Sequence, residues 1–129
     1  MARIKDVVVD CRHPASLARF WAAVLDGYAA APYDEAEMER LRALEIDDAE
    51  DDPTVLVEAP GQLPRFFFQR VDEPKVVKNR LHLDLVADDP DAELVRLLVL
   101  GATVVADRRT TEHWVTLADP EGNEFCLLW

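Results

Sequence analysis

The chain has 129 residues, half of them apolar, which is enough to bury one folded core without support from disulfide bonds. Its formal net charge of -12 at pH 7 argues against nucleic acids and anionic membranes as partners, because both bind basic surfaces. The two cysteines, Cys11 and Cys126, stand far apart and outside any CxxC spacing, which argues against a structural zinc site.

The first residues and the hydropathy of the chain indicate where it works. Residues 1–4 do not resemble a signal peptide, and no apolar run approaches the roughly 20 residues that cross a bilayer. We therefore expect a cytoplasmic protein with reduced thiols and no membrane partner.

Strand-type and helix-type segments follow one another from the start of the chain. A β-rich run over 4–11 predicts a strand, and Pro14 predicts the first turn of a helix. That helix has an apolar stripe at helical spacing, and Gly27 is placed to end it. The stripe consists of Leu17, Phe20, Trp21, Val24 and Leu25. Strand-like stretches then follow at 28–31, 54–58 and 66–71.

An extra segment at 34–45 interrupts this order. It opens with a capping-box pattern at Asp34 and has three apolar residues on one helical face, so we expect an inserted helix. These three are Met38, Leu41 and Leu44. The dense acidic run at 47–52 follows and predicts a mobile loop. Segment 34–52 is either a lid over a pocket or a plain surface insertion, and both interpretations stay open.

The second half of the chain repeats the first. Residues 81–87 predict a strand, Asp88–Asp91 with its internal proline predicts a helix start, and Gly101 predicts the helix end. The expected apolar stripe of this helix consists of Leu94, Leu97, Leu98 and Val99. Strand-like stretches follow at 102–106, 113–117 and 124–129.

Two copies of β-α-β-β-β form an internal repeat, which constrains the fold more than any single element. We assign residues 1–71 to the first module and 78–129 to the second, joined by a polar, proline-containing linker at 72–75. The chain length fits both modules into a single α+β domain over 1–129.

Three motifs carry a resemblance to a known family. They are PASLARFW at 14–21 with LDGY at 25–28, KNRLHLDL at 78–85 and DPEGNEFC at 119–126. In this order and spacing they resemble the glyoxalase-like branch of the vicinal oxygen chelate superfamily, which includes glyoxalase I and bleomycin-resistance proteins. The resemblance spans nearly the whole chain. It implies two tandem modules whose sheets form a U-shaped open barrel around a cavity, and it implies a homodimer.

The resemblance also implies a set of metal ligands. In metal-using relatives, four side chains from the first and last strands of each module hold a divalent ion. The matching positions here are Asp6, Gln69, His82 and Cys126. The familiar set is mostly His, Glu and Gln, so this sequence departs from it at Asp6 and Cys126. The implied cofactor is one divalent ion (zinc, nickel, manganese or iron), with no metal at all as the alternative.

Strand alternation supports a pocket independently of the resemblance. In the strand over 81–87 the leucines share one face, while Arg80, His82 and Asp84 share the other. The first strand likewise puts Asp6 and Asp10 opposite its helix-facing valines. All four matched positions fall on these mixed faces. Buried charges there are costly unless they bind something, so the mixed faces are expected to line a cavity.

His82 is the first catalytic candidate, because an imidazole ligates metals and moves protons near neutral pH. Asp84, on the same face, is expected to orient it or to act as a base. The expected pocket lining comprises Asp10, Phe67, Arg80, His113 and Trp114. Arg80 suits a carboxylate or phosphate group of a ligand. Core packing of the aromatic residues and a solvated rim position for Arg80 are the competing interpretations.

Two functions of different classes remain open. One is a metal-dependent lyase or isomerase that acts on vicinal oxygens of a small substrate. The other is a metal-free protein that sequesters a small molecule, as drug-resistance relatives do. A ring-cleaving dioxygenase is not expected, because the matched positions lack two histidines and a carboxylate. A true glyoxalase I is not expected either, because two of its carboxylate positions are not Glu here.

Overall fold

The computed structural model describes residue 1 and residues 3–129. It divides the chain into two compact units, 1–74 and 75–129, and the boundary falls in the predicted linker. Across the described residues, none of the helices combines the length and the apolar character that a membrane crossing requires.

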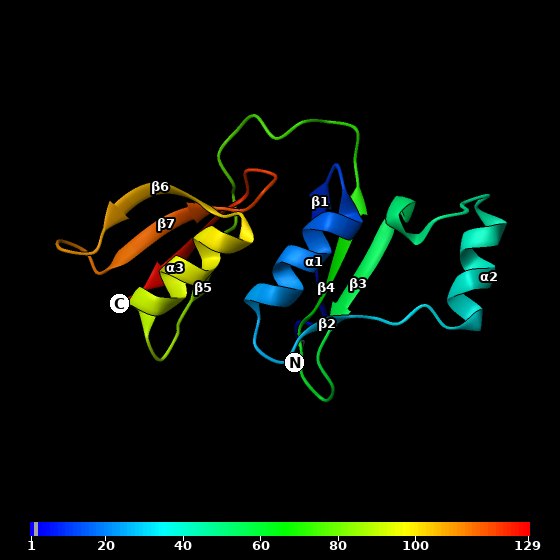
Figure 1. The fold of residues 1–129 in the computed structure, drawn as a ribbon, viewed down its shortest axis with the longest axis horizontal. Helices are drawn as coiled ribbons and strands as arrows, with labels where there is room; N and C mark the ends of the chain where they lie inside the picture. Colours follow the sequence, from blue (N-terminus) through cyan, green and yellow to red (C-terminus); the bar gives the residue numbers. More distant parts are fainter. Residues whose placement is uncertain (2) are drawn as a thin grey trace. The chain divides into compact units, whose positions relative to one another are not determined.

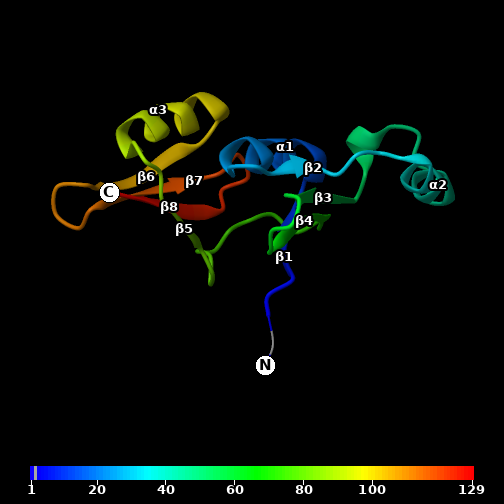
Figure 2. The ribbon, with the colours of Figure 1, turned by 90° about the horizontal axis from the view of Figure 1, so that it is seen from below.

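The first unit is one four-stranded sheet with helices (Figure 1). Its elements are β1 (Asp6–Cys11), α1 (Pro14–Val24), β2 (Ala29–Ala30), α2 (Glu35–Ala43), the 3-10 turn η1 (Ala49–Asp51), β3 (Thr54–Glu58) and β4 (Arg65–Arg70). The strand order is β1-β4-β3-β2, and β1 runs parallel to β4 while the other neighbours are antiparallel. Helix α1 covers one face of this sheet (Figure 2).

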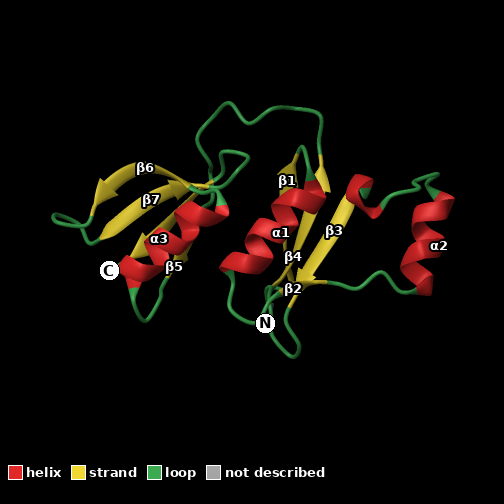
Figure 3. Ribbon diagram, viewed as in Figure 1, coloured by secondary structure: helices red, strands yellow, loops and turns green. Residues whose placement is uncertain are grey.

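The second unit has the same topology. Its elements are β5 (Leu83–Leu85), α3 (Pro90–Leu100), β6 (Thr103–Arg108), β7 (Trp114–Ala118) and β8 (Glu124–Leu128). The strand order β5-β8-β7-β6, with β5 parallel to β8, matches that of the first unit strand for strand. The predicted α+β fold with two β-α-β-β-β modules is confirmed (Figure 3).

Local signals start α1 and α3, and end α3, where the sequence placed them, whereas α1 ends at Val24 and not at Gly27. Pro14 and Pro90 lie in the first turns of α1 and α3. Backbone N–H groups in a first turn have no acceptor within the helix, so proline, which lacks this group, costs no hydrogen bond there. The Asp89 side chain caps α3 by accepting from the backbone N–H of Ala92. Gly101 ends α3 with a φ of 117°, a left-handed conformation that a residue without Cβ adopts freely.

Strand alternation separates a helix-facing side from a second side in both sheets. In β3 and β4 the buried residues are Val55, Val57, Phe66 and Phe68. Their neighbours along the same strands, including Leu56 and Phe67, are half-buried. Because successive strand residues point to opposite faces, the first set fills the core beneath α1. The second set forms the other face, as the sequence predicted.

The apolar stripe predicted for α3 is wrong for its last two residues, Leu98 and Val99. Leu94 and Leu97 are buried, but Val99 is 82% exposed and Leu98 is 42% exposed. A helix turns by roughly 100° per residue, so Val99 lies almost opposite the buried pair and Leu98 at its margin.

The acidic run at 47–52, expected to form a loop, contains the 3-10 turn η1 at Ala49–Asp51. Two acidic side chains in its second half contact other segments of the unit. Glu50 pairs with Arg19 of α1 at 2.6 Å. Asp52 is 1% exposed and accepts hydrogen bonds from Arg40, Tyr33 and the backbone of Thr54. These partners come from other segments, so charge density along the sequence could not indicate them.

We predict that Asp52→Ala lowers the free energy of unfolding by about 2–4 kcal/mol, because it leaves Arg40 and Tyr33 without their buried partner. Chemical denaturation followed by circular dichroism measures the change. Asp47→Ala in the same run is the control, since Asp47 is exposed and its loss should cost less than about 0.5 kcal/mol. Equal effects of the two substitutions would contradict the assigned role of Asp52.

The same pair of proteins also tests the charge of Asp52. Burial raises the pKa of Asp52, but hydrogen bonds from Arg40, Thr54 and Tyr33 outweigh it and leave the pKa below its usual range. The stabilisation is therefore fully present above the unfolded pKa of about 4 and is lost as the pH falls below it. We expect the destabilisation by Asp52→Ala to shrink below about pH 4. A difference that stays constant down to pH 2 would mean that the carboxylate charge contributes nothing.

Candidate functional site

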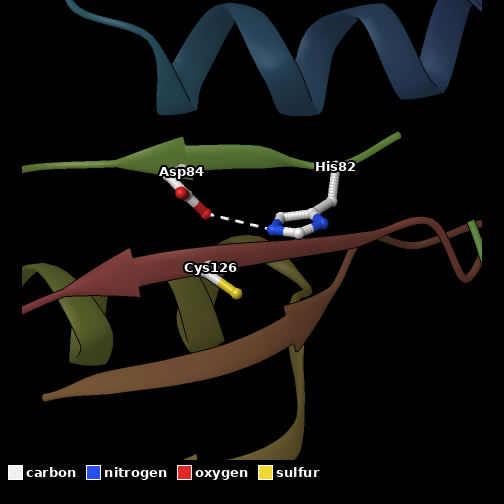
Figure 4. A group of neighbouring side chains, drawn as sticks. All are labelled: His82, Asp84 and Cys126. Carbon is white, nitrogen blue, oxygen red and sulfur yellow. Dashed lines mark ion pairs between the residues drawn. The ribbon is translucent and has the colours of Figure 1, made fainter. Parts of the chain in front are cut away.

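The parallel pairing of β5 with β8 builds the main site of the second unit. Asp84 of β5 stands directly opposite Cys126 of β8 in the register, so the two side chains share a face. His82 lies two residues before Asp84 and points to the same side. Figure 4 shows the three side chains directed toward one another.

The distances within this cluster are short. Nε2 of His82 lies 3.2 Å from a carboxylate oxygen of Asp84. One nitrogen, oxygen or sulfur atom from each of His82, Asp84 and Cys126 lies within 4.8 Å of the others. Thr116 of β7, the register partner of Cys126, places its Oγ1 3.5 Å from the cysteine Sγ. Cys126 is buried, whereas the side chains of His82 and Asp84 are about half exposed.

The cluster borders a cavity of about 270 Å³ within the second unit. This volume is near the lower end of the range for small-molecule sites. Trp114 and Leu128 supply apolar walls, and Lys78 brings a positive charge. The complete lining is Lys78, His82, Asp84, Trp114, Thr116, Glu124, Cys126 and Leu128.

Glu124 holds the segment that leads into the cluster. Its carboxylate accepts from the backbone N–H of Asn79 at 3.1 Å and lies 3.6 Å from the ammonium of Lys75. Burial raises the pKa of Glu124, but the hydrogen bond from Asn79 and the nearby lysines outweigh it and leave the pKa below its usual range. Glu124 is therefore a carboxylate at neutral pH and ties residues 75–79 to β8.

The cavity includes four of the residues singled out in the sequence, namely His82, Asp84, Trp114 and Cys126. The sequence reasoning missed Lys78, Thr116, Glu124 and Leu128. Strand alternation was a sufficient signal for three of them, since Thr116 shares a face with Trp114, and Glu124 and Leu128 share a face with Cys126. Arg80 and His113 are exposed and are not part of this lining, and their pocket role stays a prediction.

The remaining predicted residues belong to the first unit. Asp6 makes a bidentate ion pair with Arg65, at 2.8 and 3.2 Å. The hydrogen bond from Arg65 is the main reason that the pKa of Asp6 lies below its usual range. In the parallel register of β1 and β4, Gln69 stands opposite Asp10 and four positions away from Asp6. Asp6 and Gln69 are thus not neighbours within this unit, and their role as metal ligands stays a prediction.

A family model described as a glyoxalase-like domain matches residues 6–128, nearly the whole chain. The chain belongs to this family. The match agrees with the resemblance of the three sequence motifs and places the chain in the vicinal oxygen chelate superfamily. No curated protein matches the chain.

Several solved structures share the fold of this glyoxalase-like chain. A glyoxalase/bleomycin resistance protein/dioxygenase family enzyme from Burkholderia phytofirmans is 19% identical, with a TM-score of 0.65 over 98% of this chain and 97% of the other. A possible glyoxalase from Bacillus cereus is 11% identical, with a TM-score of 0.67 over the full length of both chains. The oxidase ChaP-H2 is 18% identical, with a TM-score of 0.63 over 99% and 93%. At these identities the likeness shows the fold alone, so the chemistry has to come from the residues of the site.

We predict that Glu124→Ala frees the segment at 75–79. The backbone N–H of Asn79 loses its acceptor, so its exchange with solvent should become about tenfold faster, which corresponds to a lost hydrogen bond of about 1–1.5 kcal/mol. Amide exchange followed by NMR measures this rate. Glu112→Ala, an exposed glutamate of the same unit, is the control and should leave the Asn79 rate unchanged. An unchanged exchange rate of the Asn79 amide in Glu124→Ala would show that Glu124 does not hold residues 75–79.

Proposed function

We propose that this glyoxalase-like protein is a lyase or isomerase that works with a divalent ion held by His82, Asp84 and Cys126. The observation that supports the proposal is the convergence of one imidazole, one carboxylate and one thiol at the edge of a single cavity.

The donor set fits zinc best. Zinc accepts imidazole nitrogen, carboxylate oxygen and thiolate sulfur at roughly 2.0–2.3 Å, which puts tetrahedral donors about 3.3–3.8 Å apart. The present separations of at most 4.8 Å require only small side-chain rotations, and both His82 and Asp84 are exposed enough to make them. The Thr116 hydroxyl can donate to the Cys126 thiolate and so stabilise its charged form. Three protein ligands leave a fourth position for a substrate oxygen, as in catalytic zinc sites.

When bound, such an ion supplies a Lewis acid for vicinal oxygens of the substrate. The chain's own residues account for the remaining requirements. Oδ1 of Asp84, which lies 3.2 Å from His82, would ligate the ion, and Oδ2 would then be available to take a proton from the substrate. The Lys78 ammonium would attract negative charge on the substrate, and Trp114 would offer an apolar wall to its body.

A second candidate function is metal-free binding of a small molecule, with sequestration as its purpose. It is favoured by the direct pairing of His82 with Asp84, which satisfies both groups without an ion. The apolar surfaces of Trp114 and Leu128 would then hold the ligand. Neither candidate depends on Asp6 or Gln69, whose assignment as ligands remains part of the family resemblance.

We expect the purified protein to retain about one zinc ion per chain after loading and dialysis, and expect His82→Ala and Cys126→Ser to weaken zinc binding by more than about tenfold each. Elemental analysis and competition with a chromophoric chelator measure occupancy and affinity. His13→Ala is the control, because His13 is exposed, belongs to the first unit and does not line the cavity. Zinc binding that survives both cluster substitutions would rule out this site. A wild-type protein that retains no zinc, nickel, manganese or iron would favour the metal-free alternative.

Three further proposals concern the whole chain: the single domain follows from its length, the cytoplasmic location from its first residues and hydropathy, and the homodimer from the family resemblance. The two modules act as one domain, the protein forms a homodimer, and it works in the cytoplasm. Light scattering after gel filtration would test the dimer directly.

A further inference from the structure

The first unit has a cavity of its own, with a volume of about 360 Å³. Three segments border it: the connection from β2 to α2, helix α2 itself, and the paired strands β3 and β4. In both ribbon views α2 stands out from the sheet on the side of β3 (Figures 1 and 2). The inserted helix, absent from the second module, thus supplies one wall.

The floor of this cavity is apolar. Leu56 and Phe67 are register partners on β3 and β4, so they lie side by side on one face of the sheet. This face is the one turned away from α1, and both side chains are only half-buried. Pro32 adds an apolar edge. The floor therefore offers surface to a hydrocarbon or aromatic group, with about 25 cal/mol gained per Å² removed from water.

The opposite wall is polar and its charges do not cancel. Asp52 is 1% exposed and takes two hydrogen bonds from the Arg40 guanidinium, at 3.1 and 2.6 Å. Arg40 also pairs with Glu37 at 2.6 Å. Burial and Asp52 raise the pKa of Tyr33 far above its usual value, so this phenol stays neutral. Two carboxylates and one guanidinium leave the wall with one net negative charge.

The excess negative charge faces the cavity at Glu37. Its Oε2 accepts from Nε of Arg40, while Oε1 takes no hydrogen bond from the described residues. The side chain is 42% exposed and lines the cavity. An oxygen that is charged, half-solvated and not otherwise engaged is a strong acceptor for a ligand cation. The net charge of -12 on the chain adds a field that attracts cations and repels anions.

We propose that this cavity is a second ligand site, which binds a small primary amine with an apolar body. The body packs on Leu56 and Phe67, and the ammonium donates to Oε1 of Glu37. The lining of this cavity shares no residue with the lining of the second-unit cavity. The proposal does not rest on the metal cluster, so either proposal can fail without the other.

Three probes of nearly equal shape test the assigned charge. Benzylamine, benzyl alcohol and benzoate share a phenyl ring and differ in charge, from positive to neutral to negative. In NMR titrations of the whole chain at pH 7 we expect benzylamine to bind this first-unit cavity most tightly, benzyl alcohol to bind it about tenfold more weakly, and benzoate not to bind it at all. The amides of Leu56 and Phe67 should shift. Equal affinities for the three probes, or no binding of benzylamine, would overturn the proposal.

Matched variants test the residues. Glu37→Gln should weaken benzylamine about tenfold and leave benzyl alcohol unchanged, whereas Glu39→Gln, exposed on the same helix, should change neither. Phe67→Ala should weaken both probes, and Trp114→Ala in the other cavity should weaken neither. If Trp114→Ala rather than Phe67→Ala removes benzylamine binding, the amine binds in the second unit and the proposal fails. The circular dichroism spectrum of each variant checks that it is folded, and zinc loading of Glu37→Gln should equal that of the wild type.

Discussion

The central strands of each sheet turn one face to a helix and the other away from it, and this alternation positions the strand-borne polar groups of the candidate sites, such as Asp84, Thr116 and Cys126. The helix-facing side is filled by residues such as Phe68 and Phe125, which are fully buried. Their immediate neighbours cannot enter the same core, because a strand reverses side-chain direction at every residue. Gln69 and Cys126 are therefore directed to the second face, which is left free for ligands.

The two modules use the same framework for different chemistry. Val8 and Asp84 each lie six residues before the proline that begins the following helix. In the registers, Val8 pairs with Phe67 and Asp84 pairs with Cys126. Equivalent places in the repeat thus hold an apolar pair in one unit and a carboxylate–thiol pair in the other. This difference explains why the first unit offers an apolar floor to a ligand and the second offers donors to a metal.

The insertion between β2 and β3 depends on one buried carboxylate. Asp52 is the point where Arg40 of α2, Tyr33 of the preceding connection and the start of β3 meet. A buried ion pair of this kind adds little stability over an apolar contact, but its loss is costly because the partner is left unpaired. Because Asp52 hydrogen-bonds to all three segments at once, it holds them in one arrangement, and this keeps the wall of the first-unit cavity in place.

The sequence by itself determined the order of the elements, the repeat and the family, because these depend on local signals: prolines and glycines at helix ends, the Asp34 cap and the alternation within each strand. It also placed His82 and Asp84 on one face. Only the tertiary structure decided which strands lie side by side and in which register. The strand registers place Asp84 opposite Cys126 and allow Asp6 to form an ion pair with Arg65. The packing of three segments buries Asp52. Registers between distant strands arise from backbone hydrogen bonds and core packing summed over the whole sheet, so no local pattern in the sequence specifies them.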